Sequence, residues 1–217
     1  MKAISAPQKP ERPRTPAPVI SRTGPRRSES ARQAVLHAAD DLLAERGFAA
    51  LTIEGIAARA GVAKQTIYRW WRSKVDILLD AVTQDAHEAL DWQAPGGDGP
   101  EEYLRAHLRR VAAFFEQPAG LVLRALLGHA QLDAEAAEAL RSGFLREQRE
   151  RDVAGLRAVL ERHTGRAVDE RTADRLTDVL LGPLYYRPLA FGETAGPEVT
   201  DATARLVLEL AADRPVG

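Results

Sequence analysis

Hydrophobic residues recur every three or four positions along most of this chain, which is the spacing of one face of an α-helix. The first clear stripe comprises Val35, Leu36, Ala39, Leu42 and Leu43. It predicts a helix from about Ser30 to Gly47, where glycine is a natural C-terminal stop. No segment alternates apolar and polar residues for long enough to indicate a strand. The pattern therefore predicts an all-α fold.

Breaks in the pattern divide the remaining chain into further helices. Thr52 is a favourable N-cap for a short helix that ends at Gly61. A third short helix covers about 63–71, and a longer one begins near Ser73. The clearest linker is the Pro- and Gly-rich stretch 93–100. Beyond it, the periodicity predicts helices at about 101–116, 120–131, 134–163, 169–190 and 199–212.

The first 28 residues differ in composition from the rest. They contain six prolines and five arginines; such a segment cannot bury apolar surface, so we expect residues 1–28 to be a disordered basic arm. A three-helix unit at 29–75 and a larger helical unit at 76–217 follow. Residues 1–75 carry a net charge of +8, whereas 76–217 carry −9. This asymmetry favours a polyanionic partner for the first part, with chance fluctuation along a highly charged chain as the alternative.

The segment from Thr52 to Trp71 has the residue types that two short helices meeting at a wide angle require. Gly61 tolerates the positive φ of a tight turn, and Ala57, four residues earlier, allows the helices to approach closely. Apolar residues occupy the positions that fill the angle, namely Ile56, Ala60, Val62 and Ile67. The combination predicts a helix-turn-helix, with an ordinary helical hairpin as the alternative.

The second helix of this pair presents side chains that can donate to DNA or pack against it. These are Lys64, Gln65, Thr66, Arg69 and Trp70. Because the motif also lies in the basic third of the chain, it predicts a DNA-binding domain. Arg26 and Arg27 precede the first helix and could lie in the minor groove, as basic arms do. A solvated tail is an equally good interpretation of these two arginines.

This part of the chain resembles the TetR family of repressors. The resemblance is carried by residues 51–79 and by the preceding 38–48. It implies that Thr52, Tyr68 and Lys74 contact DNA phosphates, and that residues 64–70 lie on the recognition helix.

Two positions depart from the family pattern. Ala63 stands where a serine cap is common, so one capping or phosphate hydrogen bond is expected to be missing. Arg72 stands where proline is common and adds a charge that could reach the DNA backbone. Farther along, residues 182–187 resemble a segment of one subgroup of family C-terminal domains.

The resemblance also implies that the helical bundle at 76–217 binds a ligand and forms a homodimer. Candidates for a pocket lining, with core packing as the alternative for each, are Tyr103, His107, Phe114, His129, Phe144 and Tyr185. Such a lining favours a lipophilic or aromatic effector. Apolar stripes on the last two helices could close the core or seal a dimer, and the resemblance favours a dimer through Leu180, Leu184, Leu206 and Leu210.

Other classes of function lack the residues that they need. The chain has no cysteine, no phosphate-binding Gly-Lys-Ser/Thr motif and no Gly-x-Ser-x-Gly elbow, so no enzyme chemistry is predicted. His37 with Asp41, and His129 with Asp133, have metal-ligand spacing, but we interpret them as surface charge and expect no metal or cofactor. No apolar run reaches the length of a membrane span, and we expect a cytoplasmic protein.

These observations predict a sequence-specific DNA-binding transcriptional regulator. Its expected partners are a palindromic double-stranded operator, a second copy of the chain and a small-molecule effector that releases the DNA. One alternative is an architectural DNA-binding protein without an effector. Another is a helical enzyme or carrier that contains the hairpin, which the basic N-terminal third and the missing catalytic motifs disfavour.

Overall fold

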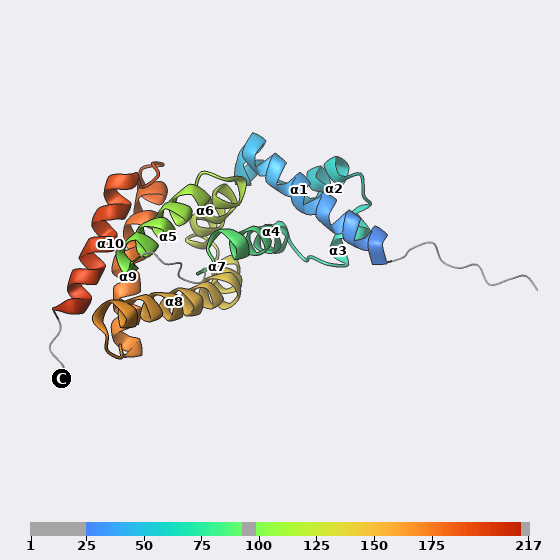
Figure 1. Ribbon diagram of the computed structural model, residues 1–217. Coiled ribbons are helices and arrows are strands. Elements are labelled where there is room, and N and C mark those ends of the chain that lie inside the picture. Colours follow the sequence, from blue (N-terminus) through green and yellow to red (C-terminus); the bar gives the residue numbers. More distant parts are fainter. Residues whose placement is uncertain (1–24, 93–98, 214–217) are drawn as a thin grey trace, which may run out of the picture.

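The structure is a computed structural model that describes residues 25–92 and 99–213 (Figure 1). These residues form helices and connections without any strand, which confirms the all-α prediction. The helices are α1 (Pro25–Ala50), α2 (Ile53–Ala60), α3 (Lys64–Tyr68), α4 (Lys74–Ala89), α5 (Pro100–Phe114), α6 (Pro118–Ala130), α7 (Ala134–Leu140), a π-helical turn (Arg141–Leu145), α8 (Arg146–Thr164), α9 (Glu170–Ala190) and α10 (Pro197–Ala212).

Most helix boundaries lie close to those that the hydrophobic pattern predicts, with two differences. α1 begins at Pro25 rather than near Ser30, and it continues to Ala50 past Gly47, whose φ of 74° interrupts the helical backbone. The single helix predicted at 134–163 is divided by the π-helical turn between α7 and α8. Periodicity detects the face that is buried, but it does not detect a local change in helical winding.

The first three helices form a small unit in which α2 packs against α1 (Figure 1). Thr52 caps α2, since its hydroxyl oxygen accepts a 3.1 Å hydrogen bond from the Gly55 amide. Arg59 in α2 donates to both carboxylate oxygens of Glu45 in α1, at 2.9 and 2.7 Å. The exposed pair adds orientation more than stability, and the shared apolar core supplies the larger contribution.

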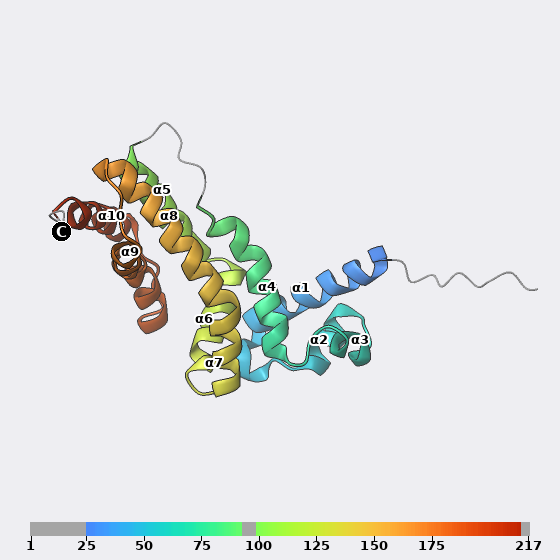
Figure 2. The ribbon, with the colours of Figure 1, turned by 90° about the horizontal axis from the view of Figure 1, so that it is seen from below.

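α4 connects this unit to the remaining helices and packs against α1, α5 and α6. It begins with a reciprocal capping box. The Asp76 amide donates to the Ser73 hydroxyl at 3.2 Å, and the Ser73 amide donates to the Asp76 carboxylate at 3.1 Å. Figure 2 shows α4 extending from α1–α3 toward the bundle that contains α5 and α8. One helix therefore spans the distance between the two parts.

The remaining helices form a bundle in which α10 packs on α5 and α9, and α8 packs on α9 and α5, while α6 lies against α1 and α4 (Figure 2). α5 and α6 meet at a sharp corner. A Cβ at Gly120 would overlap the backbone of Phe114 and Phe115, so this corner requires glycine. Fully buried aliphatic side chains such as Leu104, Leu108 and Leu156 fill the interior.

No single helix in residues 25–92 and 99–213 is long and apolar enough to cross a membrane. α5 and α6 together have the length and composition of a span, but the chain bends by 75° between them. Leu104, Leu108 and Leu123 on these two helices are buried inside the bundle.

The apolar stripes on α9 and α10 face different surroundings. Leu180 and Leu184 are buried in the core of the subunit itself. They therefore pack within one subunit, and the prediction that they lie in a dimer interface is wrong. Leu206 and Leu210 on α10 are instead 46% and 40% exposed and remain available to a partner. A stripe of leucines in the sequence shows which face is apolar, but not whether the subunit or a second copy covers it.

Asp40 on α1 is a half-buried carboxylate in an unfavourable environment. Its Oδ1 atom has no hydrogen-bond partner in the described part of the chain. Burial raises the pKa of Asp40 to about 6, with further increases from Asp85 and Asp41 and an opposing effect from His37. The folded protein therefore holds this proton at pH values where the unfolded chain releases it.

This shift predicts that the Asp40 charge destabilises the fold at neutral pH. The protonated form of Asp40 stabilises the folded state relative to the unfolded chain. This contribution is fully present below the unfolded pKa of about 4 and is lost as the pH rises through the folded pKa of about 6. Asp40→Asn should raise the melting temperature at pH 7 and change it little at pH 4. Thermal unfolding at both pH values tests this, with Asp91→Asn, at an exposed carboxylate that does not act on Asp40, as control. A lower melting temperature for Asp40→Asn at pH 7 would contradict the assignment.

Candidate nucleic-acid interface and cavity

The angle between α2 and α3 is set by one turn and a small apolar contact. Gly61 has a φ of +67°, and the Val62 amide donates to the Ala57 carbonyl oxygen at 3.1 Å. Ile56 and Ile67, one from each helix, are completely buried. These residues hold α3 across α2 in the geometry of a helix-turn-helix, as the sequence pattern predicts.

Most of the predicted DNA contacts lie on the solvent side of this motif. Those that are exposed are Thr52, Lys64, Gln65, Tyr68 and Arg69, and Thr66 is half-buried. Tyr68 is 55% exposed, a large value for an aromatic ring, and leaves its hydroxyl free to reach a phosphate. The structure thus brings donors and an aromatic ring together on one surface, while their contacts with DNA stay predictions.

The two tryptophans after α3 are fixed by packing. The buried Trp71 indole N–H donates to Asp80 at 2.9 Å, and Asp80 also accepts from Arg32 at 2.5 Å. This chain of contacts, which the sequence analysis missed, joins α1, α4 and the end of α3. Trp70 is half-buried, with its ring edge-on to Trp71 at 5.4 Å between centroids. Trp70 therefore packs within the subunit in addition to its predicted contact with DNA.

Lys64 at the start of α3 forms an ion pair that the sequence analysis also missed. Its ammonium lies 2.9 Å from the Glu54 carboxylate in the first turn of α2, and both side chains are more than half exposed. Glu54 therefore offsets a positive charge on the surface predicted to meet DNA. The two residues are ten positions apart, so only the turn between the helices brings them together.

Lys74 has a structural role at the start of α4. Its ammonium donates to the carbonyl oxygens of Phe48 at 2.8 Å and Leu51 at 3.0 Å, and lies 4.2 Å from the centre of the Phe48 ring. Burial lowers the pKa of Lys74. The side chain thus joins α4 to the end of α1, and its predicted contact with a phosphate would use the remaining N–H group.

The remaining predicted contacts flank the motif. The expected loss of a side-chain cap at Ala63 is confirmed, because the start of α3 has no capping hydrogen bond from this residue. The Arg72 side chain is exposed and free to approach DNA. Arg26 and Arg27 fall in the first turn of α1, and their side chains lie outside the described residues. Their proposed place in the minor groove stays a prediction.

Comparison with known proteins agrees with this geometry. A model of bacterial regulatory proteins of the tetR family matches residues 35–81, and a tetracyclin repressor-like C-terminal domain matches residues 97–207. The uncharacterized HTH-type transcriptional regulator YdeS of Bacillus subtilis is 32% identical over 85% of this chain and 89% of its own. The chain belongs to the TetR family of helix-turn-helix transcriptional regulators.

Solved structures of other TetR-family proteins share the fold. The TetR family transcription regulator SCO0332 is 31% identical and has a TM-score of 0.66, with 86% of this chain and all of that chain covered. A regulator from Mesorhizobium loti, 20% identical with a TM-score of 0.61 over 85% and 96% of the two chains, matches in fold alone. Members of this family are transcriptional regulators.

The bundle contains a small cavity of about 280 Å³ between α8 and α9. Its lining includes Leu145, Gln148, Asp152, Thr177, Leu181 and Tyr185. Asp152 is buried, and burial raises its pKa. Burial also raises the pKa of the Tyr185 hydroxyl. The cavity therefore combines apolar walls with a few buried polar groups, which is typical of a small-molecule site.

Only some of the predicted pocket residues lie near this cavity. Tyr185 lines it, and His107 stacks on Trp92 next to Asp152. Tyr103, one turn before His107 on α5, has its ring centroid 6.3 Å from that of Trp92. The other aromatic candidates, Phe114 and Phe144, are buried in the core.

His129 does not line this cavity, so the prediction that it belongs to the pocket is not met here. Its ring packs 4.4 Å from Phe48 at the end of α1, which places it at the contact of α6 with the helix-turn-helix unit. In the described ranges no group of three or more His, Asp or Glu side chains could hold a metal ion.

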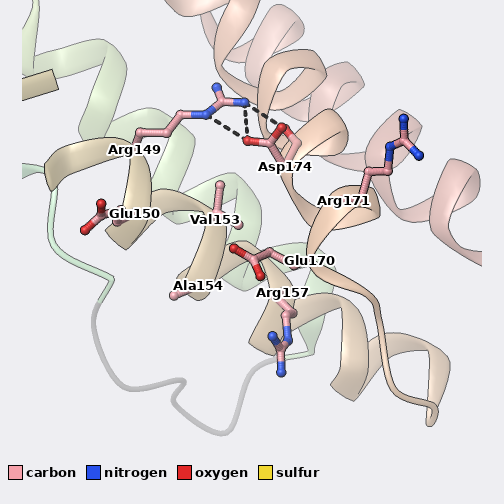
Figure 3. A pocket seen from close by; sticks show the side chains of 8 residues that line it. All are labelled: Arg149, Glu150, Val153, Ala154, Arg157, Glu170, Arg171 and Asp174. Atoms are coloured by element: carbon pink, nitrogen blue, oxygen red, sulfur yellow. Dashed lines mark hydrogen bonds and ion pairs between the residues drawn. The ribbon is translucent and has the colours of Figure 1, made fainter. Parts of the chain in front are cut away.

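A second, more open hollow of about 570 Å³ lies between α8 and the start of α9. Figure 3 shows the side chains that line it. Charged side chains dominate its rim, and Arg149 donates to Asp174 at 2.7 Å across it. The same arginine also donates to Asp178 at 2.5 Å. None of the residues predicted to bind a ligand lines this hollow, and its paired charges suit a solvated surface better than a binding site.

The Lys64–Glu54 pair predicts that Glu54 weakens DNA binding. Glu54→Gln should increase affinity for all DNA sequences by up to about fivefold, because an exposed ion pair is worth at most about 1 kcal/mol. Binding measured across a salt series tests this. Glu45→Gln, which removes the α1 partner of Arg59 and not that of Lys64, is the matched control. Weaker binding by Glu54→Gln would contradict the prediction.

The contacts of Lys74 predict a loss of stability when its charge is removed. Lys74→Met keeps most of the aliphatic stem but leaves two carbonyl oxygens without their donor, so unfolding should become easier by about 1–3 kcal/mol. Denaturant unfolding without DNA measures this, and Lys64→Met serves as an exposed control. An unchanged free energy of unfolding would contradict the structural role of Lys74 and would leave only its predicted contact with a DNA phosphate.

Proposed function

We propose that this protein is a homodimeric transcriptional repressor that a small-molecule effector releases from a palindromic operator. The observation that carries the proposal is the exposed face of α3, where Gln65 and Arg69 stand beside Lys64 and Tyr68 on a rigid helix-turn-helix. Amide and guanidinium groups can read base edges in the major groove, while lysine and tyrosine can bind phosphates. A helix held by a buried contact such as Ile56–Ile67 presents them in a fixed geometry.

Exposed apolar side chains on α9, its C-terminal end and α10 support the homodimer. They are Tyr186, Leu189, Phe191, Leu206 and Leu210, each at least 40% exposed. Tyr186 and Phe191 pack edge-on with 5.4 Å between ring centroids, and both rings are exposed. A second copy covering these side chains by a two-fold axis would hold the two recognition helices at one spacing, and a palindromic site follows from that symmetry.

The cavity between α8 and α9 supports an effector of mostly apolar character. Its volume of about 280 Å³ suits a small organic molecule, and its walls include Leu145, Leu181 and the Tyr185 ring. An effector that binds the non-DNA conformation better would release the operator by a shift in population. α4 is the mechanical link, because it contacts both α1 and the bundle.

Sequence-specific binding is tested by selecting DNA from a random pool with the purified full-length protein. A palindrome should emerge, and Gln65→Ala should cost roughly 1–3 kcal/mol while relaxing preference at particular base pairs. Arg141→Ala, an exposed arginine on the π-helical turn of the bundle, is the matched control. If the bound pool has no consensus sequence, the architectural alternative replaces the repressor.

The dimer is tested by placing a charge on α10. Leu206→Glu and Leu210→Glu should shift the protein toward monomer in sedimentation experiments and weaken operator binding in parallel, because each would bury an unpaired carboxylate between subunits. Leu132→Glu, at a leucine that is 90% exposed beyond α6, should change neither property. A wild-type protein that sediments as a monomer would overturn the homodimer.

A further inference from the structure

The indole of Trp92 fills a narrow slot between α5 and α8. Trp92 follows directly after α4, and its ring stacks on His107 with 3.9 Å between ring centroids. On the other side it lies flat on α8 at Gly155, where any Cβ would overlap the indole ring. This glycine therefore leaves room for one flat aromatic group, and Trp92 occupies it.

Asp152 holds the polar edge of this ring. The Trp92 indole N–H donates to Asp152 Oδ1 at 2.9 Å, and Gln148 Nε2 donates to the same oxygen at 3.0 Å. Asp152 is only 6% exposed, and it forms no ion pair with a Lys, Arg or His side chain in the described ranges. Its second oxygen, Oδ2, accepts no hydrogen bond from the same part of the chain. The direct hydrogen-bond donors to this buried carboxylate are neutral, while Arg149 at the cavity wall and Arg151 act on its charge from a greater distance.

The same carboxylate lines the cavity between α8 and α9. Asp152, Gln148 and Tyr185 form part of the wall of this space of about 280 Å³. Beside the slot, His107 is completely buried, and its Nε2 atom has no hydrogen-bond partner among the described residues. Arg110 donates to His107 Nδ1 at 3.3 Å, so the His107 Nε2 atom carries the proton and would need an acceptor. Asp152 is therefore the group beside the cavity that a ligand with N–H donors would satisfy.

We infer that the cavity binds a flat aromatic amine whose protonated nitrogen pairs with the free Oδ2 atom of Asp152, and that this ligand and the Trp92 N–H compete for the negative charge of that carboxylate. The inference rests on the proposed effector and adds its chemical class and its point of action. A cationic donor offers Asp152 the counter-charge that the indole N–H lacks. Once the Trp92 hydrogen bond weakens, the C-terminal end of α4 is held less firmly against α5 and α8.

Binding is tested without DNA on the full-length protein by calorimetry with two probes. Tryptamine carries an indole and a protonated amine, whereas indole-3-propionate carries the same ring with a negative charge. Tryptamine should bind and indole-3-propionate should not. Asp152→Asn, which keeps an acceptor for Trp92, should weaken tryptamine by about 10- to 100-fold. Asp213→Asn, at an exposed carboxylate after α10 and away from the cavity lining, is the control and should bind normally.

Competition is tested by Trp92→Phe, which keeps a ring on His107 but removes the indole N–H. This variant should bind tryptamine about 2- to 12-fold more tightly, because one hydrogen bond no longer competes for Asp152. General damage to the fold would weaken binding instead, so the direction of the change separates competition from a structural role. Weaker or equal binding by Trp92→Phe overturns the competition.

The outcome also separates this inference from the proposed function. If neither tryptamine nor the larger planar amine proflavine binds at millimolar concentration, or if Asp152→Asn binds tryptamine as wild type does, the amine site is overturned. Selection of a palindrome from random DNA would still support the repressor in that case. If tryptamine binds through Asp152, operator affinity should fall in its presence for the wild type but not for Asp152→Asn, as linkage requires.

Discussion

The attachment of α4 at both ends is the constraint on which the rest of the structure depends. At its start, the Lys74 ammonium is bound to carbonyl oxygens at the end of α1. Beyond its other end, Trp92 is enclosed by α5 and α8. A helix held at both ends joins the helix-turn-helix unit to the bundle as a single element, and the proposed release of DNA by an effector depends on this connection.

The local features of the fold could be predicted from the sequence because they depend on neighbours along the chain. Gly61, Ala57 and Ile67 specify the turn between α2 and α3 by residue type alone, and helical periodicity located nearly every helix. The π-helical turn at 141–145 was not predictable in this way, since the apolar face continues through it. The early start of α1 at Pro25 also departs from the pattern, in a segment whose proline and arginine content indicates no helix.

The long-range features of the candidate sites could not be predicted, because they depend on contacts between distant helices. Trp92 and Asp152 are 60 positions apart, and nothing in either neighbourhood marks them as a pair. The aromatic residues of the bundle helices indicated the cavity in part, because Tyr185 lines it. His129, however, packs near α1, and Phe114 lies in the core. The buried carboxylate that distinguishes the cavity was missed, since charged residues are ordinarily expected at the surface.

The close fit of Trp92 against Gly155 also restricts the order in which substitutions can accumulate at these two positions. With tryptophan present, any side chain at Gly155 collides with the indole ring. Replacing Trp92 by a smaller residue empties the slot and makes alanine acceptable at 155. Substitution of Gly155 therefore has to follow the replacement of Trp92. Once another residue occupies position 155, tryptophan can return at position 92 only after glycine has returned at position 155.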